Sequence, residues 1–292
     1  MEKYIDFRDQ ISRNKRNSVF LMIGVFIVIV LLGYVISLAF DPSYFFFIMI
    51  LAVIISIIYT WFGFYNSDKI AINSVGAKPA DKVKYRDYYR LVESLTVASS
   101  LPMPKLYVMD SPSINAFASG RDPKHAVVCV TTGALDKLER RELEGVLAHE
   151  MGHVKNYDIR FITLVTVMVG MISIISQIFL RSLWFKSGGN DNKNSGIFVI
   201  IGIVLAILAP IAIMFVQLAI SRRREYTADA TAVKFTRNPE GLIGALEKIE
   251  KETQPEKKVS KALAPMFFSN PFKNLSSTHP PIEKRIDVLK RM

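Results

Sequence analysis

Four long stretches without Asp, Glu, Lys, Arg or His constrain the fold of this 292-residue chain more than any other feature. They run from Asn17 to Phe40, Pro42 to Ser67, Phe161 to Leu180 and Asn194 to Ser221, with lengths of 24, 26, 20 and 28 residues. A helix of about 20 apolar residues crosses the hydrocarbon core of a bilayer. A soluble protein would have to bury four such helices, so the pattern predicts an α-helical membrane protein with four transmembrane helices.

The four spans are expected to form two hairpins that divide the chain into alternating membrane and polar parts. We place the spans at about residues 18–40, 44–65, 161–183 and 196–220. The first is too long for the core of a signal peptide and is followed almost at once by the second, so we interpret it as an uncleaved anchor. The resulting parts are residues 1–67 (N-terminal cytoplasmic segment and first hairpin), 68–160 (first polar half), 161–220 (second hairpin) and 221–292 (second polar half).

The distribution of basic residues predicts the orientation in the membrane. The three segments on one side of the spans carry 5, 14 and 15 Lys and Arg residues, whereas the two loops on the other side carry 0 and 3. Under the positive-inside rule, both termini and the polar segments are cytoplasmic. The same lysines and arginines account for the net charge of +11, because basic loops meet anionic lipid. With no nucleic-acid-binding motif in the chain, we expect a lipid bilayer and not a nucleic acid as partner.

The two polar parts together are large enough for one compact α+β domain, split by the second hairpin. Residues Tyr85 to Ser99 have the apolar spacing of an amphipathic helix. Strands are predicted at Lys105–Met109, Ile114–Ala118 and Ala126–Thr131. A second helix is predicted from Leu138 to about Asp158.

The sequence His149-Glu150-Met151-Gly152-His153 in that second helix carries the clearest chemical signal. Residues four apart lie on one face of a helix, so the two imidazoles can bind one metal ion. Glu150 lies about 100° around the helix from His149. Its carboxylate can therefore take a proton from a water beside the metal without ligating it. A chance pair of surface histidines is the competing interpretation.

A catalytic metal site of this type needs a third protein ligand and one open position. The single cysteine cannot provide a thiolate set, and Asn156 stands where an extended motif would carry a third histidine. Glu225 is the best candidate, and Asp229 follows it one turn later on the same helix face. Asp229 could accept a hydrogen bond from the free ring nitrogen of a ligating histidine. The alternative is that Arg222 to Glu225 form only a cytoplasmic charge cluster.

These residues together resemble the HtpX-like membrane zinc endopeptidases, the family that also contains the type 1 prenyl-protein proteases. The likeness extends over essentially the whole chain. The matching residues are His149, Glu150, His153, Asn156, Asp158, Glu225 and Asp229, with Asn115-Ala116-Phe117-Ala118 and with Thr278-His279-Pro280-Pro281 followed by Arg285.

The resemblance implies a zincin-like (gluzincin) catalytic domain with one Zn²⁺ per chain, held by His149, His153 and Glu225. Asn156 and Asp158 would support these ligands together with Asp229. A multi-pass protein of the plasma (inner) membrane is implied, with its catalytic domain in the cytoplasm. Its substrates would be unfolded or damaged membrane proteins, often within a stress response.

Two further sets of residues have an expected role with an open alternative. His279 or Arg285 could stabilise the oxyanion, by analogy with related zinc peptidases, but Thr278 to Pro281 equally suit a structural turn. The stretch Asn115, Ala116, Phe117 and Ala118 is expected beside an edge strand that binds extended substrate by strand addition. An ordinary buried strand end is the alternative.

Two other functions stay open from the sequence. One is a dedicated processing protease, for example for prenylated substrates. The other is a non-enzymatic membrane adaptor with structural zinc, which Glu150 argues against because a structural site needs no carboxylate beside an open position. The sequence does not indicate the oligomeric state.

Overall fold

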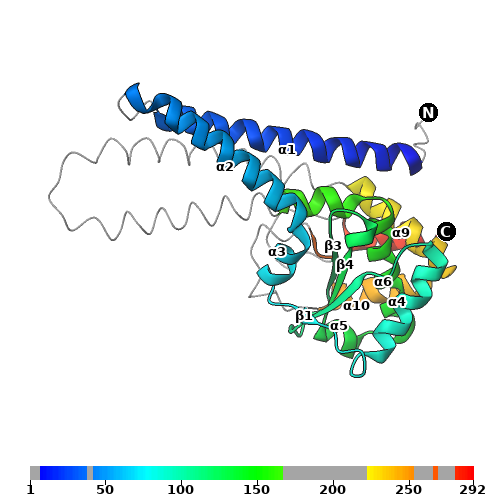
Figure 1. Ribbon diagram of the computed structural model, residues 1–292. Coiled ribbons are helices and arrows are strands. Elements are labelled where there is room, and N and C mark those ends of the chain that lie inside the picture. Colours follow the sequence, from blue (N-terminus) through cyan, green and yellow to red (C-terminus); the bar gives the residue numbers. More distant parts are fainter. Residues whose placement is uncertain (1–6, 38–41, 167–221, 253–265, 269–279) are drawn as a thin grey trace, which may run out of the picture.

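The computed structural model describes residues 7–37, 42–166, 222–252, 266–268 and 280–292. Two long helices lie side by side next to a compact α/β part (Figure 1). The spans predicted at 161–183 and 196–220 fall almost entirely outside the described residues. They therefore stay predictions, as does the division of the catalytic domain by a hairpin.

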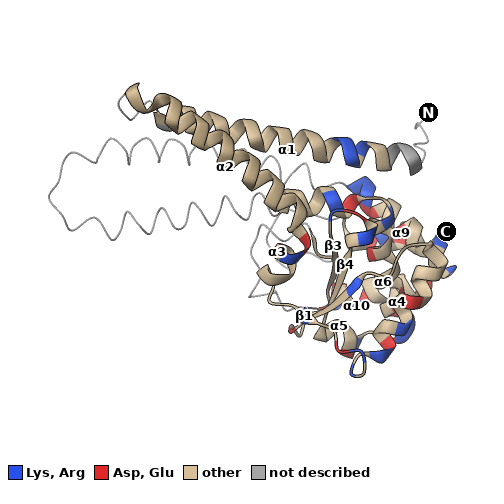
Figure 2. Cartoon of the chain, viewed as in Figure 1, with Lys and Arg blue, Asp and Glu red and all other residues tan. Residues whose placement is uncertain are grey.

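The two long helices have the length and composition of membrane spans. Helix α1 is Phe7–Ser37 and α2 is Phe45–Tyr65, preceded by the short 3-10 turn η1 (Pro42–Tyr44). The candidate spans are Ile11–Leu31 and Pro42–Tyr65, with mean hydropathies of 1.6 and 2.6. Figure 2 shows the pair almost free of charge beyond the first turns of α1.

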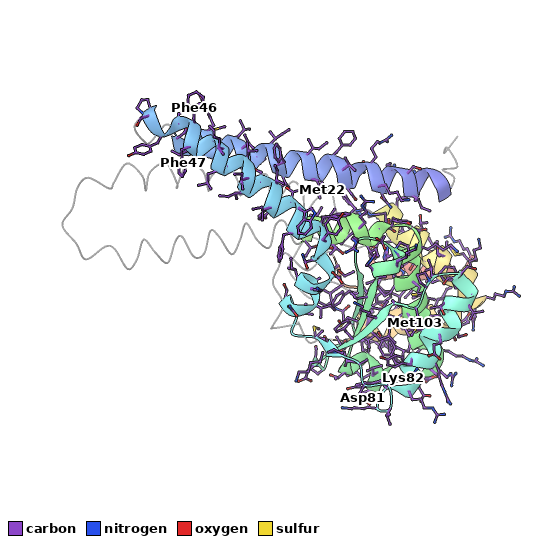
Figure 3. The ribbon with its side chains drawn as sticks, viewed as in Figure 1. Met22, Phe46, Phe47, Asp81, Lys82 and Met103 are labelled. Carbon is purple, nitrogen blue, oxygen red and sulfur yellow. The ribbon has the colours of Figure 1, made fainter. Side chains whose placement is uncertain are left out.

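Large apolar side chains point outward from this helix pair. Phe46 and Phe47 on α2 are 76% and 66% exposed and project from the end of the hairpin far from the compact part (Figure 3). Such exposure is costly in water and favourable in lipid. Helix α1 begins well before the predicted span, because its polar first turns contain no helix breaker. Those turns lie against the compact part.

The compact part contains a small mixed sheet in the order β1-β2-β4-β3. Its strands are β1 (Lys78–Pro79), β2 (Lys105–Met109), β3 (Ala116–Ser119) and β4 (Val127–Thr131). Strands β2 and β4 are parallel, and the other pairs are antiparallel. The prediction for β2 is confirmed at both ends, whereas β3 begins two residues later than predicted. Strand β3 is an edge of the described sheet, and it lies beside α6.

Helices surround this sheet, and α6 lies at their centre. The others are α3 (Ser67–Ser74), α4 (Arg86–Ser99), α5 (Thr132–Lys137), α9 (Arg222–Thr236), α10 (Glu240–Lys251) and α11 (Ile282–Leu289), with α6 at Arg140–Lys155. Helix α6 packs against α4, α9, α10 and β3. Its residues from Gly145 to Val154 are all buried. The helix that carries the metal motif is therefore a core helix.

Local chemistry fixes where α6 begins and how closely its neighbours approach. A capping box joins Glu139 and Glu142, each side chain accepting a backbone N–H of the other. Gly145 lies against the α10 backbone, where a Cβ would come within 2.6 Å of the Leu242 nitrogen. Gly152 lies against α9, where a Cβ would meet the Ala228 oxygen at 3.3 Å. Two glycines thus allow two helices to pack closely on α6.

The start of the next helical segment, residues 158–166, packs against α1. Leu21 and Val25 of α1 form a buried cluster with Phe161, Leu164 and Val165. Helix α1 therefore packs on the segment that directly follows the helix with the metal motif, through an apolar cluster of its own.

Candidate metal centre and active site

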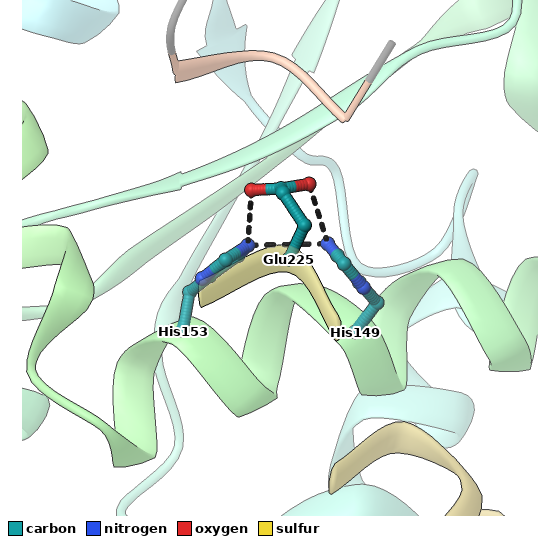
Figure 4. Close-up of side chains that lie close together, drawn as sticks. All are labelled: His149, His153 and Glu225. Carbon is teal, nitrogen blue, oxygen red and sulfur yellow. Dashed lines mark hydrogen bonds and ion pairs between the residues drawn. The ribbon is translucent and has the colours of Figure 1, made fainter. Parts of the chain in front are cut away.

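Two histidines and a glutamate bring their donor atoms together between α6 and α9 (Figure 4). The Nε2 atoms of His149 and His153 are 3.1 Å apart. The carboxylate of Glu225 lies 3.8 Å from the first and 3.6 Å from the second. All three residues are buried. Their donor atoms are close enough to bind one metal ion.

The outward ring nitrogens of both histidines face buried carboxylates. His149 Nδ1 lies 2.8 Å from Asp229 Oδ1, and His153 Nδ1 lies 3.0 Å from Asp158 Oδ2. A carboxylate in this position fixes the ring and leaves the other nitrogen for a metal. The structure thus places Asp229 and Asp158 where the helical spacing and the family resemblance expect them.

Arg285 on α11 completes the surroundings of His149. Its Nε and Nη2 donate to the two oxygens of Asp229 at 3.0 and 2.7 Å, and its Nη1 lies 3.8 Å from Glu225 Oε2. The side chain is only 1% exposed. Two of its three nitrogens are therefore engaged by Asp229. Its expected role as an oxyanion donor stays a prediction.

Glu150 lies beside the three donors with its carboxylate directed at β3. The backbone N–H of Ala118 donates to this carboxylate. Burial raises the pKa of Glu150 to about 7, and the neighbouring Glu225 charge acts in the same direction. A carboxyl group with this pKa can both accept and release a proton near neutral pH.

The two histidines differ in their affinity for a proton. Burial lowers the pKa of His149 to about 4. Burial also acts to lower the pKa of His153, but the Asp158 hydrogen bond and the Glu225 charge outweigh it and raise that pKa to about 9. The metal-free centre therefore holds its proton on His153.

A short segment, Met266 to Phe268, closes the space beside these groups. The Phe268 ring lies edge-on to the His149 ring at 4.9 Å, and the Phe268 N–H donates to the Ala116 carbonyl at 2.8 Å. The remaining cavity is lined by Glu150, Glu225 and this segment and measures about 10 Å³. That is room for about one water molecule.

Comparisons with known proteins place the chain in a family. Residues 83–292 match the model of peptidase family M48. The chain belongs to this family. This M48 chain is 48% identical to a protease HtpX homolog of Caldanaerobacter subterraneus subsp. tengcongensis over 253 residues, 84% of each chain. It is 42% identical to one of Dictyoglomus thermophilum over 294 residues, 99% of this chain and 96% of that protein.

One solved structure also aligns with this M48 chain. The crystal structure of S. mikatae Ste24p matches with a TM-score of 0.46 and 20% identity, over 95% of this chain and 65% of that chain. The family and the sequence relatives identify the chain as a metalloprotease, and the HtpX relatives together with the two apolar helices identify it as a membrane protein. Membership in a peptidase family favours an enzyme over the adaptor considered from the sequence.

The remaining predicted residues of this M48 chain have different outcomes. His279 lies outside the described residues. The Asn156 carbonyl accepts from Asn14, while its side-chain amide has no hydrogen-bond partner within the described parts of the chain. Asn115 precedes β3, and its side chain accepts from the Ala116 N–H. Ala116 and Ala118 turn backbone groups toward the site.

Two contacts of the site were not predicted from the sequence. Phe268 stands in a segment rich in Lys, Pro and Phe, with no periodicity that would place its ring on His149. Asn14 precedes the first apolar window, yet it hydrogen-bonds to Asp158, 144 residues away. A buried polar residue next to a membrane span carries no local signal of such a long-range contact.

Proposed function

We propose that this membrane metalloprotease is a zinc endopeptidase that cleaves unfolded or damaged membrane proteins on the cytoplasmic side, as part of membrane-protein quality control. One observation carries the proposal. The donor atoms of His149, His153 and Glu225 converge, and the carboxylate of Glu150 lies beside them without being one of them. Two of the compared relatives are named protease HtpX homologs, which supports the same activity.

The donor set suits zinc. Two ligands bound to zinc at about 2.0–2.1 Å in a tetrahedron lie about 3.3–3.4 Å apart. The three donor distances here are 3.1, 3.6 and 3.8 Å. Small side-chain shifts would bring all three atoms to bonding distance of one ion, and a His₂Glu set with one open position is typical of catalytic zinc.

The residues around the ion divide the chemistry between them. The chemistry supplied by a bound ion is polarisation of the peptide carbonyl and activation of a water. Glu150 takes the proton of the attacking water and then delivers it to the leaving amine, as its raised pKa allows. Asp229 and Asp158 hold the two imidazoles in place. His279 and Arg285 remain candidates for stabilising the oxyanion.

We propose that an extended segment of the substrate binds along the edge of β3, at Asn115 to Ala118. Ala116 and Ala118 direct their outward backbone groups to the same side as Glu150, which supports main-chain pairing with a substrate strand. Main-chain pairing selects extended conformation more than sequence, which suits unfolded segments. The Phe268 N–H that now pairs with Ala116 would have to leave when substrate pairs there.

The proposed topology has four spans in the plasma (inner) membrane. Both termini and the catalytic domain lie in the cytoplasm. The charge asymmetry of the loops supports this orientation. The docking of the charged first turns of α1 on the compact part also supports it, because both then lie on one side of the membrane. The proposed domain limits are 1–67, 68–160, 161–220 and 221–292.

The test uses the full chain in detergent, depleted of metal with a chelator and then supplied with zinc. The substrate is a loosely folded membrane protein. We expect cleavage only after zinc is restored. Glu150→Gln should lower the rate by about 10²–10⁴-fold, the usual contribution of a general acid–base. It should leave zinc binding intact, since Glu150 is not a ligand.

Glu144→Gln is the matched control, because Glu144 is a half-buried glutamate on the same helix but away from the three donors. This variant should cleave at the wild-type rate. A wild-type protein that binds zinc but cuts no unfolded substrate would contradict broad quality control and favour a dedicated processing role. Equal cleavage by Glu150→Gln would contradict the assigned mechanism.

A further inference from the structure

A polar side chain of the membrane anchor helix reaches the surroundings of the metal centre. Asn14 lies on α1 and is only 1% exposed. Its Nδ2 donates to Asp158 Oδ1 at 2.6 Å and to the Asn156 carbonyl at 3.0 Å. Both hydrogens of one amide group are thus used on the turn that follows α6.

The carboxylate of Asp158 connects Asn14 with a metal-ligand candidate. Its Oδ1 accepts from Asn14, and its Oδ2 lies 3.0 Å from His153 Nδ1. Asp158 is fully buried and also interacts with the buried cation of Arg224, so contacts within the protein and not solvent determine its orientation. A carboxylate held at both oxygens cannot rotate without breaking one contact. Asn14 therefore contributes to the direction of the His153 ring.

The face of α1 that carries Asn14 packs against the segment that follows α6. Asn14, Ser18, Leu21 and Val25 are each at most 4% exposed and recur at the spacing of one helix face. Leu21 and Val25 belong to the cluster with Phe161, Leu164 and Val165. The Lys15 ammonium also lies over the Tyr157 ring, 4.2 Å from its centre. Contacts on both sides of Asn14 thus hold this turn against α1.

We propose that Asn14 is a positioning residue that fixes Asp158 and, through it, His153, so that the metal centre is fully ordered only when α1 is docked on the catalytic domain. The proposal rests on the zinc site proposed above. It makes the membrane anchor part of the site's support: a displacement of α1 would loosen one ligand while leaving the other two in place.

The test measures zinc binding by the full chain in detergent, by competition with a chromophoric chelator. Asp158→Asn should weaken binding by about 10–100-fold, as is usual for partners of a ligating histidine. Asn14→Ala acts one contact further away and should weaken binding by a smaller factor, about 3–10-fold on the same scale. The absorption spectrum of the Co²⁺-substituted protein should change in both variants, because the ring orientation of His153 changes.

Ser18→Ala is the matched control. Ser18 is buried on the same face one turn later, and within the described residues its hydroxyl hydrogen-bonds only to the Asn14 carbonyl. It should bind zinc as the wild type does, with an unchanged Co²⁺ spectrum. Asn14→Asp tests whether the effect of Asn14→Ala is only one of packing, because Asp has nearly the shape of Asn. At pH 8 it should weaken binding at least as much as Asn14→Ala, because its charge opposes that of Asp158.

A double variant, Asn14→Ala with Asp158→Asn, separates a path through Asp158 from general destabilisation. It should bind zinc no more weakly than Asp158→Asn alone, because both substitutions break the same connection. Wild-type binding by a folded Asn14→Ala protein, or fully additive losses in the double variant, would overturn the positioning role alone. Absence of zinc binding by the wild type, or binding unaffected by loss of His149 and His153, would overturn the proposed zinc site itself.

Discussion

Arg285 donates two hydrogen bonds to the carboxylate of Asp229, from Nε at 3.0 Å and from Nη2 at 2.7 Å. Asp229 Oδ1 in turn lies 2.8 Å from His149 Nδ1. The guanidinium outweighs the effect of burial and lowers the pKa of Asp229, so this carboxylate stays charged. Helix α11 near the end of the chain thus supports one histidine, while α1 near its start supports the other through Asp158.

This relationship predicts the effect of Arg285→Lys. A lysine carries a charge but cannot donate to both carboxylate oxygens in the geometry of the guanidinium. We expect zinc affinity to fall by about 10–100-fold, measured by competition with a chelator. Lys284→Ala, at an exposed position next to it, should have no effect. If zinc binding is unchanged and only kcat falls, Arg285 acts on the oxyanion and not through Asp229.

The raised pKa of His153 predicts how metal binding depends on pH. Below about pH 9 the metal-free His153 carries a proton, whereas His149, with a pKa of about 4, does not. A metal must displace the His153 proton, so apparent affinity should fall close to tenfold for each pH unit below 9 from this proton alone.

Asp158→Asn provides the control for this pH dependence. It removes the charge that favours protonated His153, so the affinity should vary less steeply with pH. Titrations of zinc against a competing chelator at pH 6, 7 and 8 measure both slopes. A wild-type affinity that does not vary over this range would contradict the assignment of the proton to His153.

Much of the site could be predicted from the sequence because it depends on local helical spacing. His149 and His153 are one turn apart, as are Glu225 and Asp229, and each pair keeps to one helix face in the structure. The short apolar runs at β2 and β4 likewise predicted strands close to those observed. These features depend on the local spacing and clustering of residue types, which a sequence displays directly.

The contacts that could not be predicted join segments far apart in the chain. Asn14 meets Asp158 and Phe268 meets His149 because helices and loops dock as whole units, and no short-range pattern encodes that docking. The burial of α6 on nearly all sides could not be predicted from the sequence either, since its motif residues are polar. The two histidines face the buried carboxylates of Asp229 and Asp158, and polar groups that are paired in this way can be buried.

The close packing around Gly145 predicts that a single added methyl group lowers the stability of the fold. A Cβ there would lie 2.6 Å from the Leu242 nitrogen and 2.9 Å from the Gly241 carbonyl carbon, both backbone atoms that cannot move aside. Gly145→Ala should therefore destabilise the fold by about 1–3 kcal/mol, as overpacking usually does. Thermal unfolding in detergent, followed by circular dichroism, should show a midpoint lower by several degrees.

Gly244→Ala is the contrasting variant for this prediction. Its Cβ would meet Glu142 Oε1 at 2.9 Å, which is the end of a flexible side chain. The contact can relax, and alanine favours the helix more than glycine does, so the midpoint should change little. Equal destabilisation by both variants would show that the close approach of α6 and α10 is not what Gly145 provides.

The proposed topology predicts where an impermeant thiol reagent reaches the chain in intact cells. The native Cys129 is only 1% exposed, and burial raises the pKa of its thiol, so it should not react. A cysteine at Asn190, in the predicted loop between the last two spans, should be labelled from outside. A cysteine at Pro79, on the exposed strand β1, should be labelled only after the membrane is permeabilised. Labelling at Pro79 but not at Asn190 in intact cells would show the inverted topology. Protection of both positions in intact cells would place the loop around Asn190 on the cytoplasmic side, which would contradict a second hairpin that crosses the bilayer.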